Sequence, residues 1–427
     1  MLDRTIAPPI HDFEPFVLPQ PNSVQLLNGI PLKLFINPHL DLIHFIIRVK
    51  AGVFFEKQKN VAAFCYSILS ECHPSLSANE FDGKLDYFGA TLNVSVGFEY
   101  VTISFIVPKT HCKYAFSFLS EVLISPSFKE ESVKKQKEIK IKNWEYSSLK
   151  TDIRANRLMY NAFFGNEQPY GKIIETSDIQ SITPELLTEF YHDTFFAPNI
   201  KVYATGNIDD ELEKHIATCI SHFPAKNKSM TTPQIVFLKL PPKIVDYWEN
   251  AMQTSLLLCR PCLSYTDKDY FDFEILSTFL GGYFGSRLMQ NLREKNGYTY
   301  SVNSASSYFA DQSVFFIETE VNNDNVDYAI EACFTEMKIL REQLADEEEL
   351  NNVKQFILGS LLRSIDGTIQ YMKKYIGWED YAMTEQSFYD GIAAIQKADV
   401  QLIKSLANKY LKEENFTTIV VGKYPSK

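Results

Sequence analysis

The chain has 427 residues, of which 45% are hydrophobic, 14% aromatic and 22% charged. At about 150 residues per domain, this length predicts two or three domains, and the composition excludes collagen-like, low-complexity and disordered chains. The 42 basic and 53 acidic residues give a formal net charge of -11, which argues against nucleic acid or an anionic membrane as the main partner.

The sequence gives no sign of a membrane or an export route. No segment has the length and apolarity of a membrane-spanning helix, and the N-terminal residues carry acids and prolines where a signal peptide needs an apolar run. The seven cysteines are scattered and odd in number, which does not fit a disulfide framework. We therefore expect a cytoplasmic protein.

In chain order, the first half alternates strand and helix patterns. Alternating apolar residues predict strands over 33–38 and 44–52, and helices are expected from about Val61 and about Glu130. The segment 224–243 is rich in proline, lysine, serine and threonine, which is typical of an exposed connector around a short apolar strand.

The second half repeats this order and includes a long helix from about Asp346. Residues 177–207 and 391–423 both begin with polar residues, continue as an amphipathic helix and end in a β-rich run that closes on a glycine. Residues 102–108 and 314–321 are strand patterns that each precede a helical one.

This internal repeat has a period of about 215 residues. It predicts an α+β protein with two similar domains, over residues 1–225 and 244–427, joined by a linker over 226–243. Chance similarity between two α+β stretches is the alternative.

The histidines argue against a metal site in this chain. Hydrolytic zinc sites usually depend on this side chain. The second half has no histidine, and no two of the eight are four residues apart, so no helix face offers two imidazoles. The G-x-S-x-G, P-loop and G-x-G-x-x-G motifs are also missing. Their absence argues against a serine hydrolase of the usual type, a P-loop NTPase and a dinucleotide-binding protein.

Residues 279–304 contain a candidate site for binding a carbonyl oxygen or an oxyanion. A Gly-rich turn leads into a helix that ends near Arg293, and a strand containing Tyr300 leaves it through Asn296 and Gly297. If the strand folds back beside the helix end, a guanidinium and a phenol hydroxyl can converge on one oxygen, as a developing oxyanion requires. The alternative is an arginine that complements the helix dipole and a half-buried tyrosine.

This stretch resembles the C-terminal-domain signature of the insulinase/pitrilysin family of zinc metallopeptidases, which includes the mitochondrial processing peptidases. The matching residues are Gly281-Gly282, Ser286-Arg287-Leu288, Leu292-Arg293-Glu294-Lys295, Gly297 and Tyr300-Ser301. Upstream pieces extend the resemblance over nearly the whole chain. It implies two homologous α/β-sandwich domains, each a mainly antiparallel sheet with helices packed on one face.

The zinc motif of the family is not preserved. Family enzymes carry an inverted His-x-x-Glu-His on the first helix and a further glutamate ligand about seventy residues on, and the motif glutamate is the general base for a metal-bound water. The resemblance places Ala63, Tyr66 and Ser67 at the His, Glu and His positions, and Asn143 at the distal glutamate. These groups cannot hold zinc, so we expect no metal or other cofactor in this chain.

The resemblance implies a divided enzyme, because some family members split the work between two subunits. By that resemblance, Arg293 and Tyr300 would hydrogen-bond the carbonyl of an unfolded peptide beside the zinc of a homologous partner subunit. Strand alternation places Tyr298 on the same face as Tyr300, so it is the residue most easily confused with it. The alternatives are an inert scaffold or peptide-binding homologue, and an independent zinc peptidase with unorthodox ligands.

Overall fold

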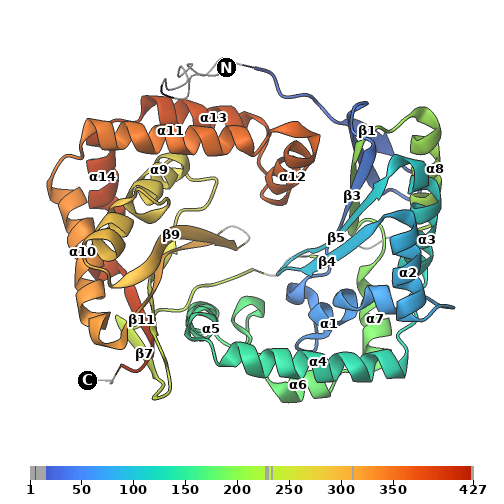
Figure 1. The fold of residues 1–427 in the computed structure, drawn as a ribbon, viewed down its shortest axis with the longest axis horizontal. Helices are drawn as coiled ribbons and strands as arrows, with labels where there is room; N and C mark the ends of the chain where they lie inside the picture. The colour runs from blue at the N-terminus through green and yellow to red at the C-terminus, as the bar shows by residue number, and fades with distance from the viewer. Residues whose placement is uncertain (1–4, 6–15, 227–229, 232–233, 310–311, 425–427) are drawn as a thin grey trace.

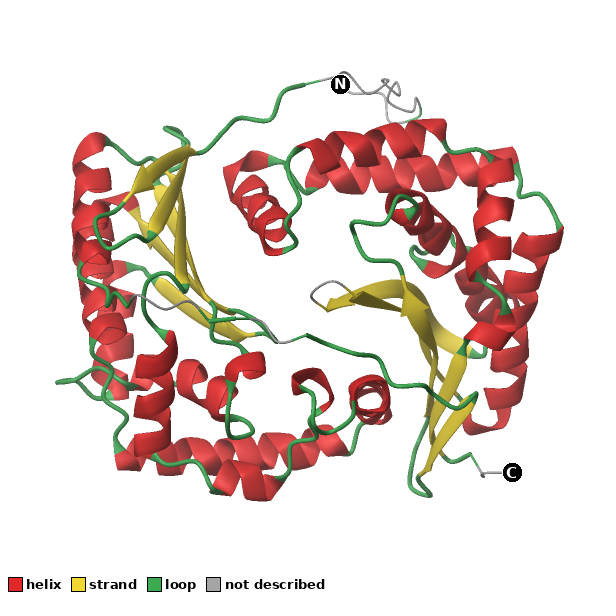
Figure 2. Cartoon of the chain, turned by 180° about the vertical axis from the view of Figure 1, so that it is seen from behind, coloured by secondary structure: helices red, strands yellow, loops and turns green. Residues whose placement is uncertain are grey.

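The structure, a computed structural model, describes residue 5 and residues 16–226, 230–231, 234–309 and 312–424. The chain forms two α+β halves, each built on one sheet, which confirms the predicted fold class (Figure 1). Seen from behind, most of the helices lie on the outside of the two sheets (Figure 2). No helix among the described residues is long and apolar enough to cross a membrane.

The first half contains a six-stranded sheet in the order β1-β2-β6-β3-β5-β4. Its strands are β1 (Asn22–Gln25), β2 (Pro31–Ile36), β3 (Leu42–Val49), β4 (Thr91–Val96), β5 (Val101–Pro108) and β6 (Ile200–Gly206). Its helices are α1 (Val61–Ser67), α2 (Ala78–Phe88), α3 (Cys112–Ile124), α4 (Glu130–Ser148), α5 (Thr151–Phe164), the short η4 (Pro169–Gly171), α6 (Thr176–Gln180), α7 (Pro184–Thr194) and α8 (Asp210–Ser221).

The second half contains a five-stranded sheet in the order β7-β11-β8-β10-β9. Its strands are β7 (Lys243–Tyr247), β8 (Thr254–Cys262), β9 (Thr299–Phe309), β10 (Gln312–Val321) and β11 (Thr417–Gly422). Its helices are α9 (Tyr270–Gly281), the π-helix η5 (Met289–Lys295), α10 (Val326–Glu342), α11 (Glu347–Arg363), α12 (Gly367–Asp380), α13 (Gln386–Lys397) and α14 (Val400–Tyr410).

The two sheets share one topology. The order β2-β6-β3-β5-β4 in the first corresponds to β7-β11-β8-β10-β9 in the second. Strand β2 is parallel to β6 and β7 is parallel to β11, whereas the other pairs are antiparallel. The paired segments 102–108 and 314–321 fall on the equivalent strands β5 and β10, each followed by a helix. The internal repeat therefore corresponds to a repeated arrangement of strands.

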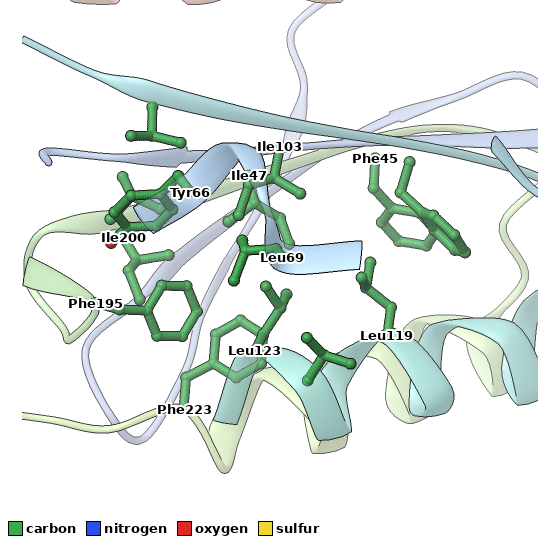
Figure 3. Packing of buried hydrophobic residues seen from close by; sticks show 14 of the residues in the cluster. Phe45, Ile47, Tyr66, Leu69, Ile103, Leu119, Leu123, Phe195, Ile200 and Phe223 are labelled. Atoms are coloured by element: carbon green, nitrogen blue, oxygen red, sulfur yellow. The ribbon is translucent and has the colours of Figure 1, made fainter. Parts of the chain in front are cut away.

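Alternation along the strands builds a separate core in each half. Ile43, Phe45 and Ile47 of β3 belong to the core beneath the helices of the first half. Figure 3 shows Phe45 and Ile47 in this core. Leu256 and Leu258 of β8 do the same in the second half. Side chains two residues apart lie on one face of a strand, so these positions bury one face of each sheet.

The opposite face of each sheet is covered by a helix from the other half. On the first sheet, Phe35 and Tyr203 pack in one cluster with Ile376 of α12. On the second, Leu257 of β8 packs in one cluster with Phe163 of α5. The predicted packing of helices on one sheet face is therefore incomplete, because each sheet is covered on both.

Ion pairs reinforce the contact of α12 with the first sheet. Arg48 of β3 pairs with Asp380, and Lys33 of β2 pairs with Glu379, with all four side chains mostly shielded from solvent. Glu379 also accepts a hydrogen bond from the hydroxyl of Tyr203. These contacts fix α12 on the sheet by charge as well as by apolar packing.

The short strand expected in the connector is not formed within the described residues of 226–243 before Lys243. Val236 instead donates its N–H to Gln168 Oε1 at 2.9 Å, and Leu238 donates its N–H to the carbonyl of Phe163 at 2.8 Å. Ile235 is buried beside α5. The apolar residues of this segment therefore anchor it to the first half and do not pair in a sheet.

The docking of α12 can be tested at Phe35, whose ring centroid lies 5.4 Å from those of both Tyr371 and Tyr375. Phe35→Ala should lower the free energy of unfolding by about 3–5 kcal/mol, because it leaves a cavity between β2 and α12. Tyr114→Ala, at a side chain 73% exposed on α3, is the control and should change stability by less than about 0.5 kcal/mol. Urea unfolding measures the change in free energy of unfolding for both variants. Equal changes would contradict the packing of Phe35 against α12.

Candidate functional site

Helix α1 contains Ala63 and Tyr66 and ends at Ser67, the three residues that the resemblance places at the family's zinc motif. Ala63 is half-buried, and Tyr66 is 0% exposed inside the core of the first half (Figure 3). The Tyr66 hydroxyl lies 2.9 Å from Thr194 Oγ1, and burial raises the pKa of this phenol well above its ordinary value. A buried neutral phenol of this kind cannot take a proton from a water as the family's glutamate does.

Ser67 is exposed at the end of α1 and accepts a hydrogen bond from a lysine of α4. Lys140 Nζ donates to Ser67 Oγ at 2.7 Å and lies 5.2 Å from the centroid of the Phe64 ring. Burial lowers the pKa of Lys140. Asn143, one helical turn further along α4, is exposed. The side chain of α4 that contacts Ser67 is thus a lysine, which the sequence analysis did not identify. Its separation of 73 residues from Ser67 is close to the spacing of about seventy expected for the distal glutamate, and this spacing was the available signal.

These residues do not fit a zinc ion. Among the described residues, no group of three or more His, Cys, Asp or Glu side chains is placed to hold a metal. The Lys140 ammonium at Ser67 would also repel a second cation at short range. Glu138 and Glu145, which flank Asn143 on α4, are exposed helix charges.

Glu56 holds the start of α1. Its two carboxylate oxygens accept the backbone N–H groups of Asn60 at 3.1 Å and Ala62 at 3.2 Å. Asn60 adopts a left-handed conformation with φ of 70°, so the chain turns sharply into the helix there. The Glu56 side chain is buried, and this burial raises its pKa to about 7 against the opposing effect of the two hydrogen bonds.

In the second half, Arg293 and Tyr300 line one open cavity of about 420 Å³. Arg293 belongs to η5, and its guanidinium lies 4.7 Å from the centroid of the Phe284 ring. Its Nε is 3.5 Å from Glu294 Oε1, and 37% of the side chain is exposed. Tyr300 is 85% exposed near the start of β9. A guanidinium and a phenol therefore line the same cavity.

Tyr298 differs from what strand alternation predicted. It precedes β9, is half-buried against the core of the second half, and stacks on Tyr328 with ring centroids 6.1 Å apart. Alternation does not extend to it because the chain is still turning at Gly297, where φ is 62°. Of the two tyrosines, Tyr300 is thus the one with an exposed ring.

The neighbouring motif residues have structural roles. Arg287 makes a bidentate ion pair with Glu349 of α11, with both N–O distances 2.9 Å. A Cβ at Gly281 would lie 2.8 Å from Ser304 Oγ, so only glycine lets α9 approach β9 this closely. Both contacts fix the elements that flank Arg293 and Tyr300.

The raised pKa of Glu56 predicts a pH dependence of stability. In the folded chain the Glu56 carboxyl keeps its proton up to about pH 7, whereas in the unfolded chain it loses the proton near pH 4.5. Its contribution to the free energy of unfolding is therefore complete below pH 4.5 and is lost as the pH rises through 7. Glu56→Gln should therefore shrink the fall in unfolding free energy between pH 5 and pH 8 by about 2 kcal/mol. Urea unfolding at both pH values measures this, and parallel curves for both proteins would contradict it.

The residues of α1 and α4 also predict that the purified chain takes up no stoichiometric zinc and cleaves no peptide alone. Lys140→Met should remain free of zinc, because removal of the ammonium supplies no ligand. Elemental analysis after dialysis against zinc measures this. One equivalent of zinc per chain would show that the positions of Ala63, Tyr66 and Ser67 have been misassigned.

Two family models match consecutive parts of the chain. Residues 43–177 match the model described as insulinase (peptidase family M16), and residues 181–357 match the model described as peptidase M16 inactive domain. The first covers the helix with Ala63, Tyr66 and Ser67, and the second covers Arg293 and Tyr300.

Relatives and solved structures agree with these models. The chain is 23% identical over 407 residues to the uncharacterized zinc protease YmxG of Bacillus subtilis, covering 93% of this chain and 98% of that protein. It is 20% identical over 432 residues to a probable mitochondrial-processing peptidase subunit beta of Arabidopsis thaliana, covering 95% and 78%. The crystal structure of a peptidase M16 inactive domain from Pseudomonas fluorescens has a TM-score of 0.85 at 18% identity, covering 96% and 99%.

Both halves thus match models of one family, over a chain whose sequence has no His-x-x-Glu-His motif. The chain belongs to the insulinase family of peptidases, family M16, as a member without the family's zinc motif.

Proposed function

We propose that this chain is the zinc-free subunit of a two-subunit zinc endopeptidase that acts on unfolded peptides. Its partner is a homologous subunit that carries the zinc motif, and Arg293 and Tyr300 bind the substrate carbonyl at that partner's metal. The observation that carries the proposal is that two exposed donors share a cavity in a chain whose own zinc positions are filled by core and lysine side chains.

The contacts of the two donors suit this role. The Tyr300 hydroxyl makes no hydrogen bond within the described part of the chain, so it is available to a ligand. Arg293 uses Nε toward Glu294, and the ends of its guanidinium remain for a further acceptor. Preorganised donors of this kind stabilise the negative charge that develops on a carbonyl oxygen during peptide hydrolysis.

The relatives support a subunit role. The Arabidopsis relative is named as a subunit of a processing peptidase. The net charge of -11 also suits a protein partner better than nucleic acid. The alternative is an inert scaffold or peptide-binding homologue, in which the two donors take no part in turnover.

Turnover by the reconstituted complex distinguishes these functions. Tyr300→Phe and Arg293→Ala should each lower kcat by roughly tens- to hundreds-fold, because each removes a donor to the oxyanion. Tyr298→Phe and Lys295→Ala are matched controls on the same segment and should leave kcat nearly unchanged. Gel filtration of each variant with the partner should show normal assembly. Unchanged turnover in both test variants would favour the scaffold.

A further inference from the structure

A second cavity, of about 390 Å³, lies in the first half between α4, α5 and η4. We call it the cationic cavity because Lys140, Arg157 and Lys172 line it and no aspartate or glutamate does. The other lining residues are Asn60, Phe98, Asn143, Trp144, Tyr160, Tyr170, Gly171, Ile173, Ile174 and Ile179. Three positive charges around one cavity are unexpected in a chain with a net charge of -11.

None of the three cations forms an ion pair with an Asp or Glu of the described chain. Lys140 donates to Ser67, and Arg157 donates to Ser148 Oγ at 3.0 Å and Ser147 Oγ at 2.9 Å. Lys172 donates only to the backbone carbonyl of Glu56, at 3.4 Å. These hydrogen-bond acceptors are neutral, the Glu56 carboxyl interacts with Lys172 only through its charge, and each of the three side chains keeps N–H donors for a further partner.

The surroundings hold these charges in a partly dry site. Burial lowers the pKa of both Lys140 and Arg157. The positive charge of the neighbouring Arg154 lowers the pKa of Arg157 further. Arg154 itself pairs with Asp246 at 2.6 Å. The nearby carboxylates are engaged elsewhere: Glu99 accepts the hydroxyl of Tyr170 at 2.8 Å, and Glu56 accepts the N–H groups at the start of α1. Neither carboxylate therefore bonds directly to one of the three cations, whose N–H donors remain for a ligand.

The aromatic side chains give the cavity a fixed wall. Trp144 donates its indole N–H to the carbonyl of Ile174 at 2.9 Å, and the Arg157 guanidinium lies 5.7 Å from the centroid of its ring. Phe98 and Tyr160 pack against Phe309 of β9, with ring centroids 6.1 and 5.6 Å away. The second half thus supports this wall, which suits the carbon chain of a ligand whose charged end meets the cations.

We propose that the cationic cavity binds a carboxylate of a peptide. An arginine and two lysines are the usual partners of a carboxylate, and arginine can bind one in a bidentate manner. The carboxylate comes from the peptide C-terminus or from an acidic side chain. That the ligand is a peptide rests on the proposed function, whereas the site rests on the charges described above.

Calorimetric titration of the isolated chain tests the proposal. The probes are four acetylated peptides of one uncharged sequence: one with a free C-terminal acid, one with a C-terminal amide, and two amides with an internal Glu or Gln. At least one carboxylate peptide should bind about tenfold tighter than its neutral counterpart, because a hydrogen bond to a charged group carries that preference. Which pair differs identifies the source of the carboxylate.

Variants test whether the preference for carboxylate over neutral peptides depends on the cationic cavity. Lys140→Met and Arg157→Gln should each abolish it, whereas Lys142→Met, an exposed position on the same helix α4, should retain it. If Lys140→Met fails to fold, Arg157→Gln decides the question alone. Equal binding of acid and neutral peptides, no binding by any of the four, or an equal loss in Lys142→Met would overturn the proposal. Because Lys140→Met and Arg157→Gln both keep Arg293 and Tyr300 in place, loss of the preference in these variants is independent of those two residues.

Discussion

The burial of both faces of each sheet is the constraint on which the rest of this structure depends. Strands such as β3 and β8 carry apolar side chains toward both faces, so helices on one side alone leave apolar surface in water. The missing cover comes from the other half, where α12 lies on the first sheet and α5 on the second (Figure 1). The two halves therefore complete each other's cores, and the cationic cavity lies close to the contact between them.

Against this common framework, the two copies have diverged in opposite directions. In the first, Tyr66 of α1 fills the core and Ser67 accepts a hydrogen bond from Lys140. In the second, η5 and β9 keep two donors in an open cavity. One topology thus carries a cavity lined by three cations in the first half and a cavity lined by the two donors in the second.

A lysine beside Ser67 offers different chemistry from a metal ion. A zinc ion lowers the pKa of a bound water and polarises a carbonyl, whereas an ammonium offers only charge and hydrogen-bond donors. Protonated Lys140 can therefore attract an anion, but it does not activate a water in the way that a zinc ion does.

The sequence by itself determined the local structure and the lack of a zinc motif. Period-two alternation gave β3 and β5, the repeated order of patterns gave two α+β halves, and the absence of histidine between His44 and His73 removed the motif. The turn at Asn296 and Gly297 predicted that Arg293 and Tyr300 lie near each other, because few residues separate them. All these features depend on short stretches of chain, where residue type and spacing limit the backbone to few conformations.

Only the tertiary structure decided which distant side chains meet. Lys140 reaches Ser67, and α12 covers β2 and β6, through packing between elements far apart in the chain. The same packing gathers Lys140, Arg157 and Lys172 around one cavity, although each is an ordinary helix or loop charge in the sequence. Periodicity shows which face of an element is apolar but not which element covers it, because that choice depends on the shapes of two surfaces that form only when the halves dock.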